Sequence, residues 1–330
     1  MAMMDAAGRS WIFLSLISLF CLCTGAGPMY KLDPSWPSLP SVFNGPVYSA
    51  AVDDKHGEIY VSQRGYFNSP VLVFNTSGAL LRSFSYDPVI IDMVHGMRMH
   101  YNASTGKSRL WLTDVGDGRF GYTVKKFSPD GKLLEFVLGT HGEKGNGTSP
   151  LQFDQVADVA ISDQGEMFIV DGDGGMNNRL LKLDKDLTLE WHVGVNGSKP
   201  GQFYIPHSVE LDGVGRVWVA DRMNGRLQAF DANNGSYLGE WSSCFTDGQP
   251  YSVRLSADQT HFIVTQLQSD RILFVASPRQ AGAIGNCIIM DSIQLASGSH
   301  PHLVAVSLLE GAFYVGEIGS KTCQKYIRVK

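Results

Sequence analysis

The sequence predicts an all-β protein, a six-bladed β-propeller. A unit of about 45–50 residues recurs six times along the chain, which is the period of propeller blades. Within each unit, short stretches alternate apolar and polar residues, and no helical stretch of consequence interrupts them. The chain also has 36 glycines in 330 residues and 11% aromatic residues, which indicates many turns between aromatic-bearing strands.

Each unit begins with an apolar-x-apolar strand, turns into a second strand that ends in a polar residue, and adds a third strand after another turn. The first two strands of the six units read VYSAAVDDKHGEIYVSQ (47–63), VHGMRMHYNASTGKSRLWLTD (94–114), VADVAISDQGEMFIVD (156–171), PHSVELDGVGRVWVAD (206–221), PYSVRLSADQTHFIVTQ (250–266) and PHLVAVSLLEGAFYVGE (301–317). Fourth strands follow several units. The predicted blades span residues 45–88, 91–140, 152–195, 202–242, 248–297 and 300–330.

The sixth unit reaches Lys330 with only three strands. The N-terminal segment MYKLDPSW (29–36) is the candidate for its missing outer strand, which would close the ring and remove an open edge. A solenoid of the same units is the alternative, but an open stack needs polar caps that the sequence lacks. The mature chain, residues 28–330, is therefore expected to form one propeller.

Residues 1–27 are predicted to be a signal peptide. Arg9 precedes an apolar run from Trp11 to Cys23, which is short for a membrane span and is followed by small residues. An uncleaved N-terminal anchor is the alternative, and no later stretch approaches the length of a span. We expect a secreted or lumenal protein with glycans at five Asn-x-Ser/Thr sites, Asn75, Asn102, Asn146, Asn196 and Asn234.

Three cysteines remain after removal of the signal peptide: Cys244, Cys287 and Cys323. An odd number in an oxidising compartment predicts one disulfide and one leftover thiol. The repeat pattern places Cys244 and Cys287 in the same blade, so they are the expected pair, although spacing alone does not fix the connectivity. The state of Cys323 stays open.

The charge of the chain excludes some classes of partner. The net charge is −5, charged residues make up 18% of the sequence, and no basic run stands out. Nucleic acid and anionic membrane surfaces are therefore not expected to bind this protein.

One position near the start of the first strand varies regularly from blade to blade. It holds, in order, Tyr48, His95, Ala157, His207, Tyr251 and His302. Histidine thus occupies alternate blades, about 120° apart in a six-bladed ring, where innermost strand ends face the axis. Three converging imidazoles form the ligand set of a catalytic Zn²⁺ with one open position. The alternative is that each histidine packs under a turn or bonds to a carbonyl group.

A polar residue ends the second strand of every unit, where it is expected to bond turn N–H groups. These residues are Gln63, Asp114, Asp171, Asp221, Gln266 and Glu317. The next position holds arginine in units one and four, Arg64 and Arg222, on opposite blades. Their guanidinium groups are expected to face each other above the metal, where a bidentate fork suits a carboxylate. Surface ion pairing is the alternative.

The repeats resemble the NHL family, most specifically in the stretch DRMNGRLQAFD (221–231), and the resemblance covers nearly the whole mature chain. They are also similar to the lyase domain of the peptide-amidating enzyme, which shares the propeller. The zinc ligands of that lyase are three histidines, matched here by VHG (94–96), PHS (206–208) and PHL (301–303). The resemblance implies zinc at those histidines. It also implies that Arg64 and Arg222 match the arginines that bind the substrate carboxylate and serve the reaction centre.

Two positions depart from the lyase. Its catalytic tyrosine follows the second strand of the third blade, where this sequence reads DGDGGMNNR (171–179) with Asp173 in the corresponding place. Its calcium site uses an aspartate after the third histidine, where this chain has Leu303, so a Ca²⁺ site is doubtful. Tyr48 and Tyr251 stand beside the histidines and are further candidates for substrate binding.

These features predict a secreted binding protein that retains a lyase-like metal site and has lost amidating-lyase activity. Its expected ligands are a protein, a peptide or a small carboxylated molecule at the propeller face. One alternative is an active zinc-dependent lyase-like enzyme on a small carboxylated substrate of the peptidyl-hydroxyglycine type. Another is a plain interaction scaffold, because a fold does not define a function.

Overall fold

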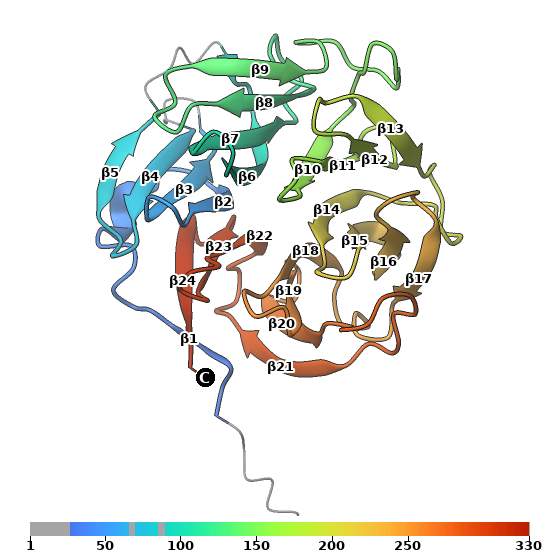
Figure 1. Ribbon diagram of the computed structural model, residues 1–330. Coiled ribbons are helices and arrows are strands. Elements are labelled where there is room, and N and C mark those ends of the chain that lie inside the picture. The colour runs from blue at the N-terminus through green and yellow to red at the C-terminus, as the bar shows by residue number, and fades with distance from the viewer. Residues whose placement is uncertain (1–26, 66–69, 85–89, 330) are drawn as a thin grey trace, which may run out of the picture.

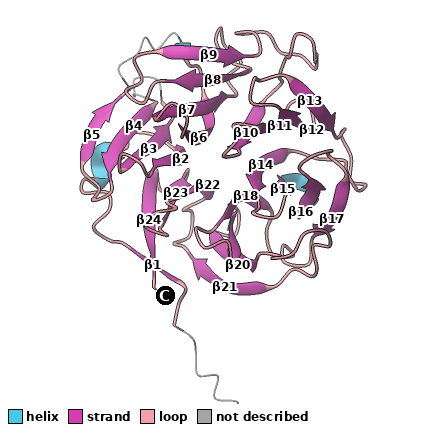
Figure 2. Ribbon diagram, in the orientation of Figure 1, coloured by secondary structure: helices cyan, strands magenta, loops and turns pink. Residues whose placement is uncertain are grey.

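The computed structural model describes residues 27–65, 70–84 and 90–329, and within them six four-stranded antiparallel sheets form a ring (Figure 1). The predicted all-β, six-bladed propeller is confirmed. Strands account for nearly all of the regular structure in Figure 2. Helical turns of the described residues include η1 (Pro40–Val42) and η3 (Arg222–Asn224), both 3-10 helices.

Each blade runs from an innermost strand at the axis to an outermost strand at the rim. Blades one and two contain β2 (Val47–Asp53), β3 (Glu58–Gln63), β4 (Val71–Asn75), β5 (Leu80–Ser83), β6 (Val94–Asn102), β7 (Lys107–Asp114), β8 (Thr123–Phe127) and β9 (Leu134–Leu138). Blades three and four contain β10 (Val156–Ile161), β11 (Met167–Asp171), β12 (Arg179–Leu183), β13 (Leu189–Val193), β14 (Pro206–Leu211), β15 (Arg216–Asp221), β16 (Arg226–Asp231) and β17 (Tyr237–Trp241). Blades five and six contain β18 (Pro250–Leu255), β19 (His261–Gln266), β20 (Arg271–Ala276), β21 (Ile289–Gln294), β22 (Pro301–Val306), β23 (Phe313–Glu317), β24 (Thr322–Arg328) and β1 (Tyr30–Leu32).

The hydrophobic core lies between neighbouring blades. Strand β15 shows how the sequence builds it, because all six of its residues are buried and successive side chains point to opposite faces. Trp218 packs with Phe262 of the following blade, whereas Val217 packs with Phe168 of the preceding one. The blades are therefore buried on both faces, which explains the near-continuous apolar runs in their second strands.

The first strand of the chain completes the last blade. β1 pairs antiparallel with β24, Tyr30 opposite Arg328 and Leu32 opposite Tyr326. This strand belongs to the segment 29–36, the sequence candidate for the closing strand. The end of that segment leaves the sheet, and Trp36 packs between Phe74 of blade one and Tyr314 of blade six. The edge of β24 is thereby covered, and the ends of the chain meet in one blade.

The predicted signal peptide, residues 1–27, lies outside the described residues apart from Gly27. Within the described ranges, no helix is long and apolar enough to cross a membrane. Cys244 and Cys287, the pair expected from the repeats, are joined by a disulfide bond. Cys323 is a buried free thiol, and burial raises its pKa well above the ordinary value.

Candidate metal centre

A β-bulge opens the innermost strand of every blade. The pairing register shifts between the residues on either side of the position that the repeats singled out. The shifts fall at Val47/Ser49, Val94/Met97, Val156/Asp158, Pro206/Ser208, Pro250/Ser252 and Pro301/Val304. A bulge leaves one residue unpaired and re-aims its side chain. The six variable residues, three of them histidines, therefore owe their direction to this shared irregularity.

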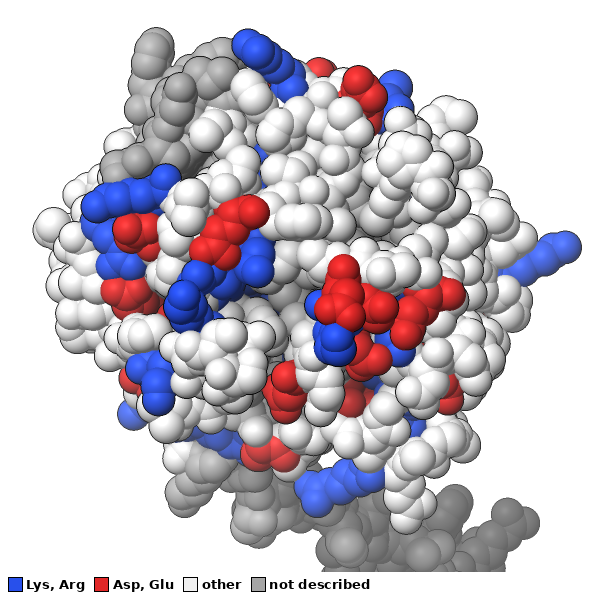
Figure 3. All heavy atoms as spheres, turned by 45° about the horizontal axis from the view of Figure 1, so that its top comes forward, with Lys and Arg blue, Asp and Glu red and all other residues white. Residues whose placement is uncertain are grey.

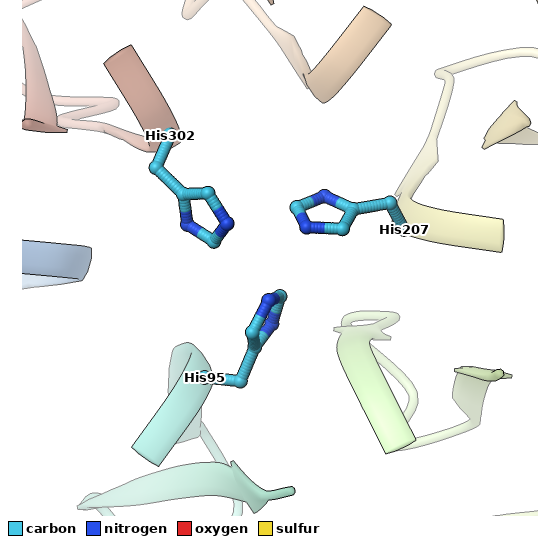
Figure 4. A group of neighbouring side chains, drawn as sticks. All are labelled: His95, His207 and His302. Atoms are coloured by element: carbon cyan, nitrogen blue, oxygen red, sulfur yellow. The ribbon is translucent and has the colours of Figure 1, made fainter. Parts of the chain in front are cut away.

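The three histidines of alternate blades meet at the axis (Figure 4). His95 comes from β6, His207 from β14 and His302 from β22, and all three are buried. Their ring centroids are separated by 4.7, 4.7 and 4.8 Å, with interplanar angles of 81°, 89° and 79°. One ring nitrogen of each lies within 4.8 Å of those of the other two. This is a nearly threefold arrangement of possible metal ligands.

Each histidine uses its Nδ1 in the same way, as donor to the backbone carbonyl of the bulge residue in the following blade. The bonds join His95 Nδ1 to Ala157 O at 2.7 Å, His207 Nδ1 to Tyr251 O at 2.6 Å and His302 Nδ1 to Tyr48 O at 2.8 Å. A carbonyl only accepts, so Nδ1 carries the hydrogen and Nε2 keeps its lone pair for a metal. The Nε2 of His207 is buried without a hydrogen-bond partner among the described residues, which fits a metal ligand.

The environment favours the neutral imidazole at His207 and at His302. Burial lowers the pKa of His207 to about 3, and it lowers the pKa of His302 well below the ordinary value, with the neighbouring histidines adding to the effect. Neutral imidazole is the form that binds metal ions.

Asp173 reaches the same centre from the turn after β11. Its Oδ2 lies 3.1 Å from His95 Nε2, and its Oδ1 accepts a hydrogen bond from Arg222 Nη1 at 3.1 Å. Burial opposes ionisation of this carboxyl, but the contacts with His95, and after them the charges of His207 and Arg222, hold the pKa of Asp173 well below its usual range. The sequence marked Asp173 only as the residue in place of the lyase tyrosine. The sequence did contain a signal for the contact between Asp173 and His95, namely an acidic residue in a turn at the end of the axis where the histidines lie.

Arg64 and Arg222, the arginines noted in the sequence, approach the tripod from opposite blades. Arg64 stacks on the ring of Tyr48 at 3.5 Å, and Arg222 lies over Tyr251 at 4.8 Å. Arg222 is engaged by Asp173. The Nε of Arg64 donates to Val94 O, while its Nη2 is buried and lacks a partner within the described parts of the chain. Burial lowers the pKa of Arg64. The Nη2 of Arg64 and the Nε of Arg222, which is likewise buried without a partner in the described ranges, are therefore the donors that suit an incoming carboxylate.

The two candidate tyrosines line the same centre. Tyr48 lies 5.1 Å from the ring of His302, and Tyr251 lies 5.0 Å from that of His207. The hydroxyl of Tyr251 accepts a hydrogen bond from Gln268 Nε2 at 2.7 Å. The structure thus places all of the sequence-predicted side chains, three histidines, two arginines and two tyrosines, at one end of the axis.

Further along the innermost strands from the three histidines, ion pairs join side chains of different blades. Arg254 contacts Asp158 at 2.9 Å, and Arg98 contacts Glu210 at 2.9 Å. Beyond them a cavity of about 870 Å³ opens at the other ends of these strands, lined in part by Met99, Asp163, Leu255 and Leu309. Leu303, at the position of the lyase calcium ligand, is completely buried and supplies no side-chain oxygen.

Six four-stranded antiparallel blades in a ring define a β-propeller, and three histidines meet at its axis. The proteins named NHL repeat-containing protein 3 from Homo sapiens and Mus musculus are each 47% identical to this chain over 300 residues, which is 91% of this chain and 84% of theirs. The chain belongs to the family of NHL repeat-containing protein 3. No protein-family model matches the chain.

Two more distant similarities are to proteins that are named lyases. A peptidyl-alpha-hydroxyglycine alpha-amidating lyase of Drosophila melanogaster is 27% identical over 241 residues, covering 67% of this chain and 43% of that protein. Among solved structures, a streptogramin B lyase has a TM-score of 0.57 at 13% identity, covering 91% of this chain and 98% of the other. At this identity, the likeness shows the fold alone.

Proposed function

We propose that the protein is a secreted, glycosylated binding protein whose axial site holds a zinc ion. A protein, peptide or small carboxylated ligand would bind at the propeller face around that site. The observation that carries the proposal is the shared use of Nδ1 by His95, His207 and His302, which leaves a second nitrogen of each ring for the metal.

Each residue has a definite part in this proposal. The three histidines would hold the ion, and bound zinc would supply a concentrated positive charge at the axis beside the ligand. Arg64 would pair its unengaged Nη2 with a ligand carboxylate, with Tyr48 holding the guanidinium in place by stacking.

Two features support the secretory part of the proposal. Asn102, Asn146, Asn196 and Asn234 are exposed and Asn75 is half-buried, so the predicted glycan sites are open to modification. The Cys244–Cys287 bond suits an oxidising compartment. Recovery from the culture medium, with a mass that falls on glycosidase treatment, is the expected result; retention inside the cell would contradict it.

The face shown in Figure 3 intermixes acidic and basic side chains among many uncharged ones. Together with the net charge of −5, this distribution favours a protein or small-molecule ligand over a polyanion.

The central test is the zinc content of the protein purified from the medium. Wild type is expected to contain stoichiometric zinc, and His207→Ala is expected to lose it because removal of one histidine from the tripod weakens zinc binding. The exposed His192→Ala serves as the matched control and should keep its zinc. Zinc-free wild-type protein would refute the proposal.

A zinc-dependent lyase is the second candidate, favoured by Arg64 and Arg222 beside the tripod and by the similarity to amidating lyases. Against it, Asp173 stands where those enzymes have their tyrosine. We expect the zinc-loaded protein to leave a peptidyl-α-hydroxyglycine intact, and turnover at an enzyme-like rate that His207→Ala abolishes would establish the lyase instead.

A further inference from the structure

The turn DGDGG fixes the position of Asp173. Gly172 has a φ of +149° and donates its N–H to Gln155 O, which also accepts the N–H of Asp173 at 2.8 Å. A Cβ at Gly172 would lie 2.0 Å from Asn177 O, so only glycine fits there. The backbone before Asp173 is thus held by two hydrogen bonds and by close packing, and the carboxylate is presented to the axis rather than to solvent.

The two carboxylate oxygens of Asp173 have different neighbours. Oδ1 is held by Arg222 Nη1 at 3.1 Å, and Oδ2 lies 3.1 Å from His95 Nε2. The side chain of Asp173 is 17% exposed, and that of His95 is 2% exposed. One oxygen is anchored by the arginine while the other faces the nitrogen that the tripod offers to a metal.

The contact between Asp173 and His95 calls for a cation. The Nδ1 of His95 donates to Ala157 O, so Nε2 and the carboxylate oxygen are both electron-pair donors unless a cation lies between them. That cation is either a proton on Nε2, which makes the contact an ion-paired hydrogen bond, or a metal ion. Adjacent ligands of a tetrahedral zinc ion, each about 2.0–2.1 Å from the metal, lie about 3.3 Å apart. The observed 3.1 Å is close to that separation.

Resting on the proposed zinc site, we propose that Asp173 is the fourth protein ligand and closes the coordination shell of His95, His207 and His302. The site is then a three-histidine, one-carboxylate centre without the open position that catalytic zinc requires. Arg222 is the positioning residue that holds the second oxygen of Asp173. The internal carboxylate thereby occupies the metal position that an external oxygen ligand would use and engages Arg222, whereas Arg64 stays available to a ligand carboxylate beside the metal.

Co²⁺ substituted for zinc tests the ligand set, because its visible absorption reports coordination without any need for activity. We expect Asp173→Ala to change the spectrum and to weaken Co²⁺ binding on the order of 100-fold. Acetate is the second probe. Acetate should leave wild type unchanged and should shift the Asp173→Ala spectrum back toward wild type, because it fills the vacated position.

The exposed Asp247→Asn controls for loss of one negative charge, since the Asp247 side chain is 77% exposed and lies 3.8 Å from Arg271. It should bind Co²⁺ as wild type does. An Asp173→Ala spectrum and affinity equal to wild type, or a wild-type spectrum that shifts with acetate, would overturn the fourth-ligand assignment while leaving the zinc site intact. Failure of wild type to bind Co²⁺ or zinc at all would instead overturn the zinc site itself.

Discussion

At the scale of single residues, Gly96 determines whether His95 can reach its carbonyl partner. A Cβ at Gly96 would lie 2.7 Å from Ala157 O and 2.9 Å from Asp158 Cα. The glycine therefore allows blades two and three to approach closely enough for the bond between His95 Nδ1 and Ala157 O.

We expect Gly96→Ala to push these blades apart at the bulge. The predicted loss of unfolding free energy is about 1–3 kcal/mol from overpacking, measured by denaturant unfolding. Zinc affinity should fall about 10-fold or more, because the carbonyl that orients His95 is displaced.

Gly201→Ala is the control that separates the effect of Gly96→Ala on stability from its effect on zinc affinity. Gly201 has a φ of +75° but open space around its Cβ position, so alanine there strains the backbone without touching the tripod. It should lower stability and leave zinc affinity unchanged. An unaltered zinc affinity in Gly96→Ala would show that the carbonyl contact does not organise the site.

The sequence predicts part of this centre and misses part of it. Comparison of six repeats reveals His95, His207 and His302, because a repeated backbone places equivalent residues in equivalent positions. The carbonyl group that each Nδ1 bonds to, and the position of Asp173 beside His95, depend on the geometry of bulges and turns. The period of a strand does not encode that geometry, since one glycine such as Gly172 sets the direction of the side chain that follows it.

At the scale of secondary structure elements, β1 is the short strand that closes the ring, and a buried histidine supports it. The Tyr30 hydroxyl lies 3.0 Å from His261 Nε2, and the Tyr30 ring stacks on Phe274 at 4.9 Å. Burial, with a further contribution from Arg328, lowers the pKa of His261 from 6.5 to about 4.

The depressed pKa of His261 makes ring closure sensitive to acid. A group whose pKa is lower in the folded state contributes stability that is present above its unfolded pKa of 6.5 and is lost as pH falls through about 4. The wild-type protein should therefore lose about 2–3 kcal/mol of unfolding free energy over this range through His261 alone.

His261→Gln removes this titration and retains a hydrogen-bonding side chain. Denaturant unfolding at several pH values should show that the difference between variant and wild type changes by about that amount between pH 6.5 and 4. The exposed His192→Gln is the control and should follow the wild-type curve. Parallel curves for His261→Gln and wild type would contradict the assignment.

At the scale of the whole molecule, the closure of the ring was predictable from the sequence, but the contacts between blades six and one, where the ring closes, were not. A sixth repeat with three strands and a spare N-terminal segment implied closure by chain ends. The burial of Trp36 between Phe74 and Tyr314 depends on how the chain leaves β1, and no periodic pattern specifies that path. The hydrogen bond from His302 Nδ1 to Tyr48 O also joins blade six to blade one, so the candidate metal centre contributes to the closure of the ring.

The three histidines come from alternate blades, so a metal bound to them exists only while the whole ring is assembled. Binding to the folded state alone stabilises it by about 2.7 kcal/mol when free zinc is 100 times the dissociation constant. For a domain of this size, that corresponds to a rise in Tm of roughly 5 °C. Scanning calorimetry with zinc or with a chelator should show this difference for wild type and for the exposed His192→Ala, but none for His207→Ala. An equal rise in His207→Ala would place the stabilising zinc elsewhere on the surface, because without His207 the ion no longer links three separate blades.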